Sequence, residues 1–246
     1  MLEESRILNI NDLSSYQANP DFKPDKRNLW KIPPEKTGWV LAHNAIRGEI
    51  SSFEKTLINI KNPLQKSQIE SIKIWWNGHS IHVHEHHSNE DNVFNPFLRT
   101  RINYPDKLES DHEQLVEHLN KIDSCIKTIS QNDAINELLD LWIQYKEMMF
   151  PHLLEEEKIG LPLVMAYFTP EEVSEVTAEF AKKGDKCAIG SFIHWMETKE
   201  NCMEFMENEG IPWFVWYLPC CGFKSHRDHY RSVMIKSIEN INKNCI

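Results

Sequence analysis

Basic residues are scarce in this chain. Its 246 residues include 27 lysines and arginines against 37 aspartates and glutamates, which gives a formal net charge of −10 at pH 7. A nucleic-acid-binding surface needs clustered positive charge to neutralise phosphates. The charge balance therefore argues against nucleic acid as a partner. It favours cation binding only weakly, because most acidic proteins are simply well solvated.

Cysteine pairs at the spacing of metal or disulfide sites are absent as well. The chain contains no Cys-x-x-Cys pair, and its six cysteines stand at positions 125, 187, 202, 220, 221 and 245. This pattern fits neither a zinc ribbon nor a disulfide framework. We expect a reduced, cytoplasmic protein.

The chain also lacks a long uninterrupted apolar run. The longest, residues 211–223, contains Pro212 and Pro219 and is too short to cross a bilayer. The opening residues MLEESRILNIND are acidic and lack the apolar stretch of a signal peptide. No phosphate loop, nucleophile elbow, internal repeat or strand-like alternation stands out. We therefore expect no membrane contact, and any chemistry must come from other residues.

Helical periodicity, in contrast, is strong. Apolar residues recur every three to four positions in four long segments, at about 35–61, 65–92, 110–129 and 134–157. Ser110 and Glu113 fit a capping box at the start of the third segment. Residues 93–109 carry two prolines and are expected to form a long loop. Shorter helices are expected at about 170–183, 188–207 and 225–242.

These patterns predict an all-α fold. Its centre would be an up-down-up-down four-helix bundle over residues 36–160. Residues 1–35, which are polar and contain four prolines, are expected to form an irregular arm. Residues 161–246 are expected to form a helical extension packed on the bundle. With 41% apolar residues the chain can bury a core of this size.

Histidine is concentrated in one place. Five of the twelve histidines lie within residues 79–87. His86 and Glu90 stand four apart, so on a helix both side chains share one face. His152 and Glu156 repeat that spacing. Three neighbouring carboxylates are rotated off these faces at about 100° per residue: Asp91, Glu155 and Glu157.

Each long segment contributes one histidine to what we expect to be a single layer: His43, His86, His112 and His152. Counted at about 1.5 Å per residue from the connecting loops, neighbouring histidines agree in level to about one turn. Glu90 and Glu156 would complete the layer, and burying them without a cation would be costly. Four imidazoles and two bridging carboxylates suit two iron ions, with manganese or zinc as alternatives. A ferritin-like site is disfavoured, because only Glu109 and His112 form a Glu-x-x-His motif.

With these motifs the chain resembles the hemerythrin-like family, also called HHE cation-binding domains. The matching pieces are AHNAIR around His43, HHSNEDNVF with His86 and Glu90, DHEQL with His112, and HLLEEE with His152 and Glu156. They occur in the family's order and spacing. The resemblance implies a four-helix bundle with an oxo- or hydroxo-bridged di-iron centre that binds oxygen, or that stores or senses iron.

One departure from the family pattern concerns the third helix. Oxygen-carrying hemerythrins have a second histidine there, one turn after the first, and this chain has Val116 at that position. His118 lies about 240° around the helix from His112, so it cannot substitute. An open position is therefore expected at one iron, filled by water or, as the best protein substitute, by His82. Simple reversible oxygen carriage is not expected.

The remaining histidines have weaker claims. His79 and His82 could support the site or guide ions into it, or could lie on an exposed helix face. Four histidines are interpreted as surface: His84, His87, His226 and His229. For His87 the alternative is contact with an acidic neighbour. Arg47 is expected to pair with a buried carboxylate. The aromatic run at 213–217 is expected to pack in the core or between domains, with a partner surface as the second interpretation.

Three functions remain open from the sequence. The first, which we favour, is a metal-binding module that handles oxygen or iron without turnover, and hence is not an enzyme. The second is an oxidase or peroxidase that uses the open iron position. The third is an iron-responsive regulatory protein read out through residues 161–246. Metal ions and oxygen are the expected partners, and the sequence names no protein partner.

Overall fold

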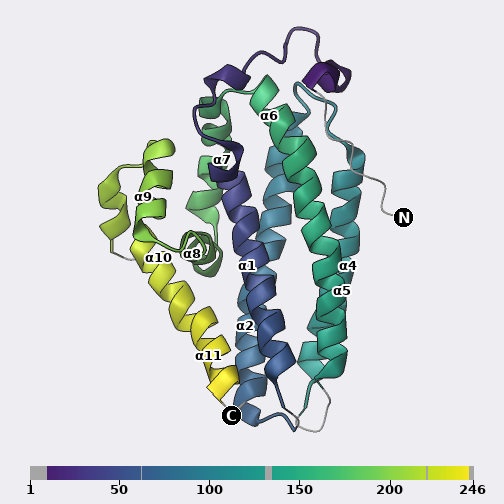
Figure 1. The fold of residues 1–246 in the computed structure, drawn as a ribbon, viewed down its shortest axis with the longest axis vertical. Coiled ribbons are helices and arrows are strands. Elements are labelled where there is room, and N and C mark those ends of the chain that lie inside the picture. The colour runs from purple at the N-terminus through teal and green to yellow at the C-terminus, as the bar shows by residue number, and fades with distance from the viewer. Residues whose placement is uncertain (1–9, 62, 131–134, 220, 244–246) are drawn as a thin grey trace.

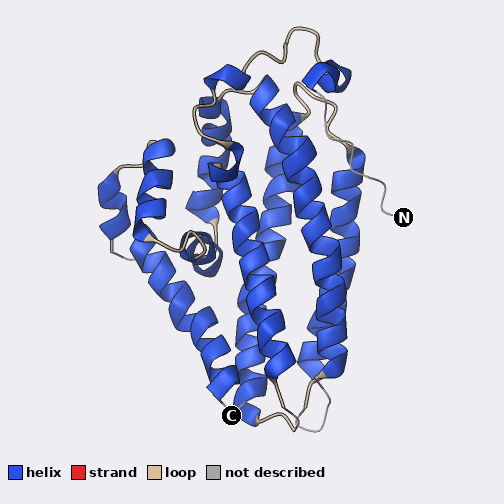
Figure 2. Cartoon of the chain, in the orientation of Figure 1, coloured by secondary structure: helices blue, strands red, loops and turns tan. Residues whose placement is uncertain are grey.

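The computed structural model describes residues 10–61, 63–130, 135–219 and 221–243. All regular secondary structure in these residues is helical, apart from one isolated bridge between Gln17 and Ile102 (Figure 2). The all-α class expected from the sequence is therefore confirmed. Among the described residues, no helix is long and apolar enough to cross a membrane.

Four long helices run side by side along the long axis of the molecule (Figure 1). They are α1 (Gly38–Asn59), α2 (Lys66–Asn89), α4 (Asp106–Thr128) and α5 (Asn136–Glu155). Helix α5 packs against α1 and α4, and α2 packs against α4. Thr37 caps α1, accepting a hydrogen bond from the Val40 N–H, and Gln65 and Gln68 form a capping box at the start of α2.

Two boundaries differ from the sequence prediction. Helix α4 begins one turn earlier than expected, and Ser110 is not its N-cap, because the Ser110 hydroxyl donates to the Lys107 carbonyl inside the helix. The expected loop at 93–109 is also partly helical. A π-turn, η4 (Glu90–Phe94), continues α2 into the short helix α3 (Asn95–Leu98). The chain therefore stays helical through the region that carries Glu90.

Aromatic side chains fill the middle of the four long helices. Phe53 stacks on Trp75 with ring centroids 4.0 Å apart, and Trp142 meets both rings edge-on. The Trp142 indole N–H donates to the Ile50 carbonyl, which satisfies its one buried donor. These residues belong to the largest apolar cluster of the molecule. This cluster holds the four long helices together in the middle of their length, next to the layer where the histidines lie.

A second apolar cluster lies at the end where α1 begins and α5 ends. It includes the π-turn η5 (Glu156–Gly160) and helices α6 (Leu161–Tyr167) and α7 (Pro170–Lys183). The arm before α1 contains three 3-10 turns, at Ile10–Tyr16, Arg27–Leu29 and Pro34–Lys36. It is tied to this end by Trp30, whose indole donates to the Phe168 carbonyl, and by Tyr167, whose hydroxyl donates to the Leu13 carbonyl.

The C-terminal helices lie against one side of α1 and α2 (Figure 1). They are α8 (Lys186–His194), α9 (Lys199–Asn208), α10 (Phe223–Tyr230) and α11 (Lys236–Lys243), with the 3-10 turn η6 (Trp213–Tyr217) before α10 and the π-turn η7 (Arg231–Ile235) after it. Helix α8 packs tightly on α10. A Cβ on Gly190 would lie 2.3 Å from the His226 carbonyl oxygen, so only glycine fits at this crossing.

Two expectations for this region were wrong. The single helix expected at 188–207 is broken into α8 and α9, and Glu197 between them has a φ of 66°, which no α-helix accommodates. The aromatic run is largely exposed instead of packed inside. Trp213, Phe214 and Tyr217 are 65%, 50% and 54% exposed, and only Trp216 of this run is buried.

Candidate metal centre

The four long helices bring their predicted histidines together near one end. His43 lies on α1, His86 at the end of α2, His112 on α4 and His152 on α5. Three of them are buried, and the His86 side chain is 11% exposed. The two predicted carboxylates are buried in the same place, with Glu90 6% and Glu156 2% exposed. All six predicted ligands therefore share one layer.

The first of two groups of side chains holds four of these ligands: His43, His86, Glu90 and Glu156. One ligand atom from each lies within 4.8 Å of the others. His86 Nε2 is 3.4 Å from Glu90 Oε2, and His43 Nε2 is 3.4 Å from Glu156 Oε2. Two imidazoles and two carboxylates around one point are a donor set that iron, manganese and zinc accept.

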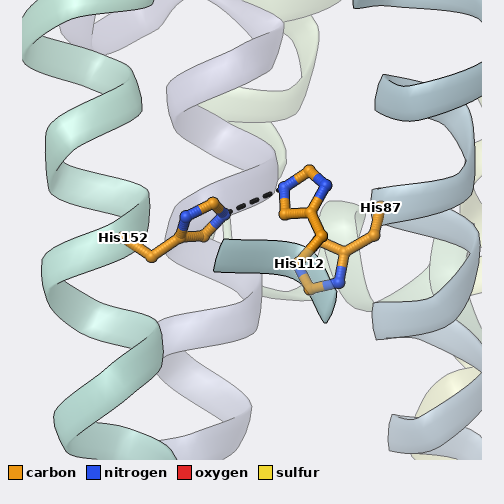
Figure 3. A group of neighbouring side chains, drawn as sticks. All are labelled: His87, His112 and His152. Carbon is orange, nitrogen blue, oxygen red and sulfur yellow. Dashed lines mark hydrogen bonds between the residues drawn. The ribbon is translucent and has the colours of Figure 1, made fainter. Parts of the chain in front are cut away.

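The second group consists of three imidazoles, from His87, His112 and His152 (Figure 3). The Nε2 atoms of His112 and His152 are 3.1 Å apart, and the ring of His87 stacks on that of His112 at 4.3 Å. The carboxylates of the first group face this group too. Glu90 Oε2 is 3.7 Å from His112 Nε2, and Glu156 Oε1 is 3.5 Å from His152 Nε2. Each carboxylate therefore faces the histidines of both groups.

Each of these two glutamates is the first residue of a π-turn. The N–H of Asn95 bonds to the Glu90 carbonyl and that of Leu161 to the Glu156 carbonyl, five residues apart in both cases. Pro96 and Pro162 each stand six residues after the glutamate. A proline has no N–H and clashes with the carbonyl one turn back, so the regular ladder cannot continue there. The repeated Glu-x5-Pro spacing is a signal that the sequence carries for this geometry, and π-turns are frequent at functional sites.

Several buried polar atoms of this layer have no hydrogen-bond partner. They are His43 Nε2, His86 Nε2, both ring nitrogens of His87, Glu90 Oε2, His152 Nδ1 and Glu156 Oε2. Leaving one such atom unsatisfied costs about 1–3 kcal/mol. So many buried nitrogen and oxygen atoms without a partner in one place fit a cation. The residues present are therefore suited to hold metal.

The outer nitrogens of two histidines are fixed by carboxylates. His43 Nδ1 lies 2.9 Å from Glu157 Oε1, and Arg47 donates to the same oxygen at 2.6 Å. His112 Nδ1 lies 2.7 Å from Asp91 Oδ1. Histidine ligands are commonly oriented by such contacts, which leave Nε2 free for a metal. Glu157 and Asp91 are off the ligand layer as predicted, and Arg47 pairs with a carboxylate as predicted.

Comparison with known families identifies the arrangement. A family model described as hemerythrin HHE cation binding domain matches residues 37–164, just over half of the chain. The chain belongs to the hemerythrin HHE cation binding domain family. The resemblance suggested by the sequence is thereby confirmed, and cation binding is the property that the family's description carries. No curated protein and no solved structure matches the chain.

Without a metal, two imidazoles of this HHE domain have raised pKa values and a third has a lowered one. Burial lowers the pKa of His43, but the hydrogen bond to Glu157 and the charges of Glu90 and Glu156 outweigh burial and raise that pKa to about 9. Burial also lowers the pKa of His112, but the Glu156 and Glu90 carboxylates outweigh it and raise that pKa to about 9. Burial lowers the pKa of His86 to about 3, so His86 is neutral at pH 7.

Metal binding at neutral pH should therefore release protons. A metal needs the Nε2 lone pairs of His43 and His112, which are protonated below their pKa values of about 9. We expect release of about two protons at pH 7, and an apparent metal affinity that rises with pH until about 9. Calorimetric titration with Mn²⁺ in buffers of different ionisation enthalpy measures the number released. A heat that is independent of the buffer would contradict the assignment.

His87 is the residue that the sequence interpretation missed. We expected it on the surface, yet it is 3% exposed and belongs to the second group. The error came from assuming that each helix directs all of its inward side chains toward one side. The interior of the HHE domain is wide enough at this level for α2 to direct His86 toward His43 and the next residue toward His112. Two adjacent histidines at the end of a core helix were the available signal.

The other histidines that the sequence analysis considered range from buried to exposed. The exposed-face interpretation of His79 and His82 is wrong, because both are buried around Glu49, which the sequence analysis did not single out. His82 belongs to neither group, so its expected role as a substitute ligand is not supported. His84 and His229 are exposed as predicted, and His226 is half-buried; none of them joins a metal-ligand group of the described residues.

Val116, the position at which the sequence lacks a second histidine on α4, lies at a surface pocket. The volume of this pocket is ≈ 370 Å³, and Asp91, Glu109, His112 and Glu113 line it together with Val116. His118 points elsewhere, with Nε2 2.8 Å from the Leu141 carbonyl. The absence of an imidazole at Val116 therefore leaves a carboxylate-lined opening beside His112.

Proposed function

We propose that this HHE domain binds two metal ions, most simply iron, and that the protein handles oxygen or iron by binding, storage or sensing. The observation that supports this most is the pair of ligand groups joined by Glu90 and Glu156, with buried nitrogen and oxygen atoms that have no partner in both groups. The metal-binding domain would span residues 36–160 as an up-down-up-down four-helix bundle. Residues 1–35 would form its arm and residues 161–246 an extension.

The ligands divide between the two ions as follows. His43 and His86 would hold one ion, and His87, His112 and His152 the other. The two carboxylates would bridge them, because each faces both groups. His87 would thus supply from α2 the fifth imidazole that Val116 does not supply from α4. Nitrogen and carboxylate donors of this kind accept iron, manganese and zinc.

An iron pair in this place would supply electron transfer to oxygen. The chain's own contribution is to orient the ligands and control access. Glu157 and Asp91 hold His43 and His112 in one tautomer with Nε2 toward the layer. Trp39 packs edge-on against His43 and Phe94 and limits water at the end of the layer. The pocket beside Val116 leaves one approach for small molecules.

An oxidase or peroxidase function is the second candidate, and the pocket beside His112 is the observation that favours it. An oxidisable substrate would need access to an ion, and this pocket is lined by His112, one of the proposed ligands. A binding protein and an enzyme differ in turnover. Consumption of oxygen or peroxide well beyond the amount of bound iron would favour the enzyme.

His87 provides the test that separates this ligand set from the six residues predicted from the sequence. His87→Ala removes one of three imidazoles of the second group and none of the first. We expect the metal content to fall from about two ions to about one per chain. Elemental analysis of protein loaded anaerobically with Fe²⁺ measures it. His84→Ala is the matched control on the same helix, because His84 is exposed and must leave the content unchanged. Full occupancy in His87→Ala would exclude His87 as a ligand.

A further inference from the structure

A second buried polar layer lies two helical turns below the metal centre. It contains Glu49 on α1, His79 and His82 on α2, and Tyr145 on α5. Tyr145 precedes His152 by seven residues, and His79 precedes His86 by seven, so each lies about 10 Å along its helix from a ligand. Glu49, His79 and Tyr145 are 1%, 0% and 0% exposed. The proposed function makes no use of this layer.

Hydrogen bonds link the four side chains of this layer in a row, from His82 through Glu49 and His79 to Tyr145. Glu49 Oε2 lies 2.6 Å from His79 Nδ1 and 3.1 Å from His82 Nδ1. An ionised carboxylate only accepts, so each Nδ1 donates. His79 Nε2 lies 3.2 Å from the Tyr145 hydroxyl oxygen. In neutral His79 that nitrogen carries a lone pair, and the phenol donates to it. Burial lowers the pKa of His79 and raises that of Tyr145, which agrees with a neutral imidazole and a neutral phenol.

We propose that Tyr145 is a one-electron donor to the metal centre and that His79 takes up its proton. This inference rests on the proposed function. The Tyr145 O–H bond breaks, the proton forms an N–H bond at His79 Nε2, and one electron reduces the oxidised centre. The tyrosine becomes a neutral radical, and the new imidazolium is balanced by Glu49. The carboxylate is thus placed to stabilise the charge that the transfer creates.

Tyrosine loses its electron readily only when a base accepts the proton at the same time. Among the described contacts, no other buried tyrosine hydroxyl is hydrogen-bonded to an imidazole. The Tyr167 hydroxyl donates to the Leu13 carbonyl, and the Tyr230 hydroxyl accepts from the Trp195 indole and is hydrogen-bonded directly to the Glu49 carboxylate, with no imidazole between them. A backbone carbonyl is a far weaker base than an imidazole. The imidazole with a carboxylate behind it is what distinguishes Tyr145.

Oxidisable rings also connect Tyr145 to the edge of the helix bundle. The Trp142 ring lies 5.3 Å from that of Tyr145, and the Trp76 ring lies 6.2 Å from that of Trp142. The Trp76 indole donates to Asp123, a half-buried carboxylate at the surface of α4. A one-electron reductant in solution, such as ascorbate, could replace the electron along this row, and His79 would return its proton to the Tyr145 oxygen. The layer would then return the centre to its reduced form or keep surplus oxidant from accumulating.

The test uses the full-length protein loaded with iron and treated with hydrogen peroxide. Peroxide takes up two electrons and two solvent protons to give two waters; one electron comes from Tyr145 and one from the iron pair. Electron paramagnetic resonance of rapidly frozen samples should show a tyrosyl radical in the wild type. Incorporation of ring-deuterated tyrosine should narrow that signal, which identifies it as a tyrosyl radical. Metal-free protein with peroxide should show none.

Four variants assign the radical. Tyr145→Phe removes only the hydroxyl and should lose the signal, and His79→Gln should lose it although the phenol remains. Tyr167→Phe is the matched buried control and should keep it. Tyr104 is the competing donor, because its hydroxyl lies close to the π-turn at Gly160. Loss of the signal in Tyr104→Phe, or its survival in Tyr145→Phe, would overturn the proposal.

Metal content, measured on the same samples, separates iron binding from electron donation by Tyr145. Tyr145→Phe should hold as much iron as the wild type, since it contacts no ligand atom in the described contacts. Iron binding without a tyrosyl radical in the wild type would refute the electron-donor role and leave the proposed function intact. Failure of the wild type to bind iron would refute the proposed function itself.

Discussion

His86→Ala should abolish most metal binding. His86 belongs to the first group, where its Nε2 is the nitrogen nearest to Glu90 Oε2, at 3.4 Å. Removing it leaves one imidazole for that ion, and Glu90 loses the partner that holds it beside both groups. If Glu90 and Glu156 bridge two ions as proposed, the loss should extend to the second ion. We expect a fall from about two ions to well below one per chain.

Elemental analysis after anaerobic loading and gel filtration measures this loss. His84→Ala, two residues earlier on α2 and exposed, is the control for a general effect of removing a histidine from this helix. Circular dichroism must show that both variants keep their helices. Retention of full stoichiometry in a folded His86→Ala protein would mean that the first group is not the binding site.

Removal of metal should lower the melting temperature by a large margin. A ligand that binds only the folded state adds about 4 kcal/mol of stability at a thousandfold excess over its dissociation constant. For a domain of this size each kcal/mol shifts the melting temperature by about 2–4 °C, so we expect a difference of roughly 8–16 °C. In the metal-free form, Glu90 Oε2 and Glu156 Oε2 stay buried without hydrogen-bond partners.

Differential scanning calorimetry of chelator-treated protein, with and without added Mn²⁺ or Fe²⁺, gives this difference. His86→Ala serves as its control, because a protein without the site should melt at the same temperature in both conditions. Equal melting temperatures in the wild type, at a metal concentration that saturates the site, would contradict a link between folding and this centre.

The sequence predicts that these six side chains lie close together because helical spacing is regular. Histidines and glutamates four residues apart share a face in any α-helix, and one histidine per helix at equal depth is a pattern that length alone can test. The six predicted ligands therefore come together in the structure. The side chains that orient them follow less directly, since contacts such as Glu157 with His43 depend on how two helices are rotated against each other.

Features that depend on packing between helices were not predictable in the same way. His87 was assigned to the surface because a single helix suggests one inward direction, whereas neighbours on two sides allow two. Glu49 is buried because α2 supplies His79 and His82 opposite it, and those partners are about 30 residues away in sequence. The early start of α4 and the break at Glu197 likewise reflect the tertiary environment outweighing local signals.

Anomalous X-ray diffraction at the iron edge, from crystals of the iron-loaded protein, tests most directly whether two ions bind in this layer. We predict two anomalous peaks, one beside His43 and His86 and one beside His87, His112 and His152, with Glu90 and Glu156 between them. A single peak, peaks outside this layer, or a second peak without His87 among its ligands would contradict this prediction.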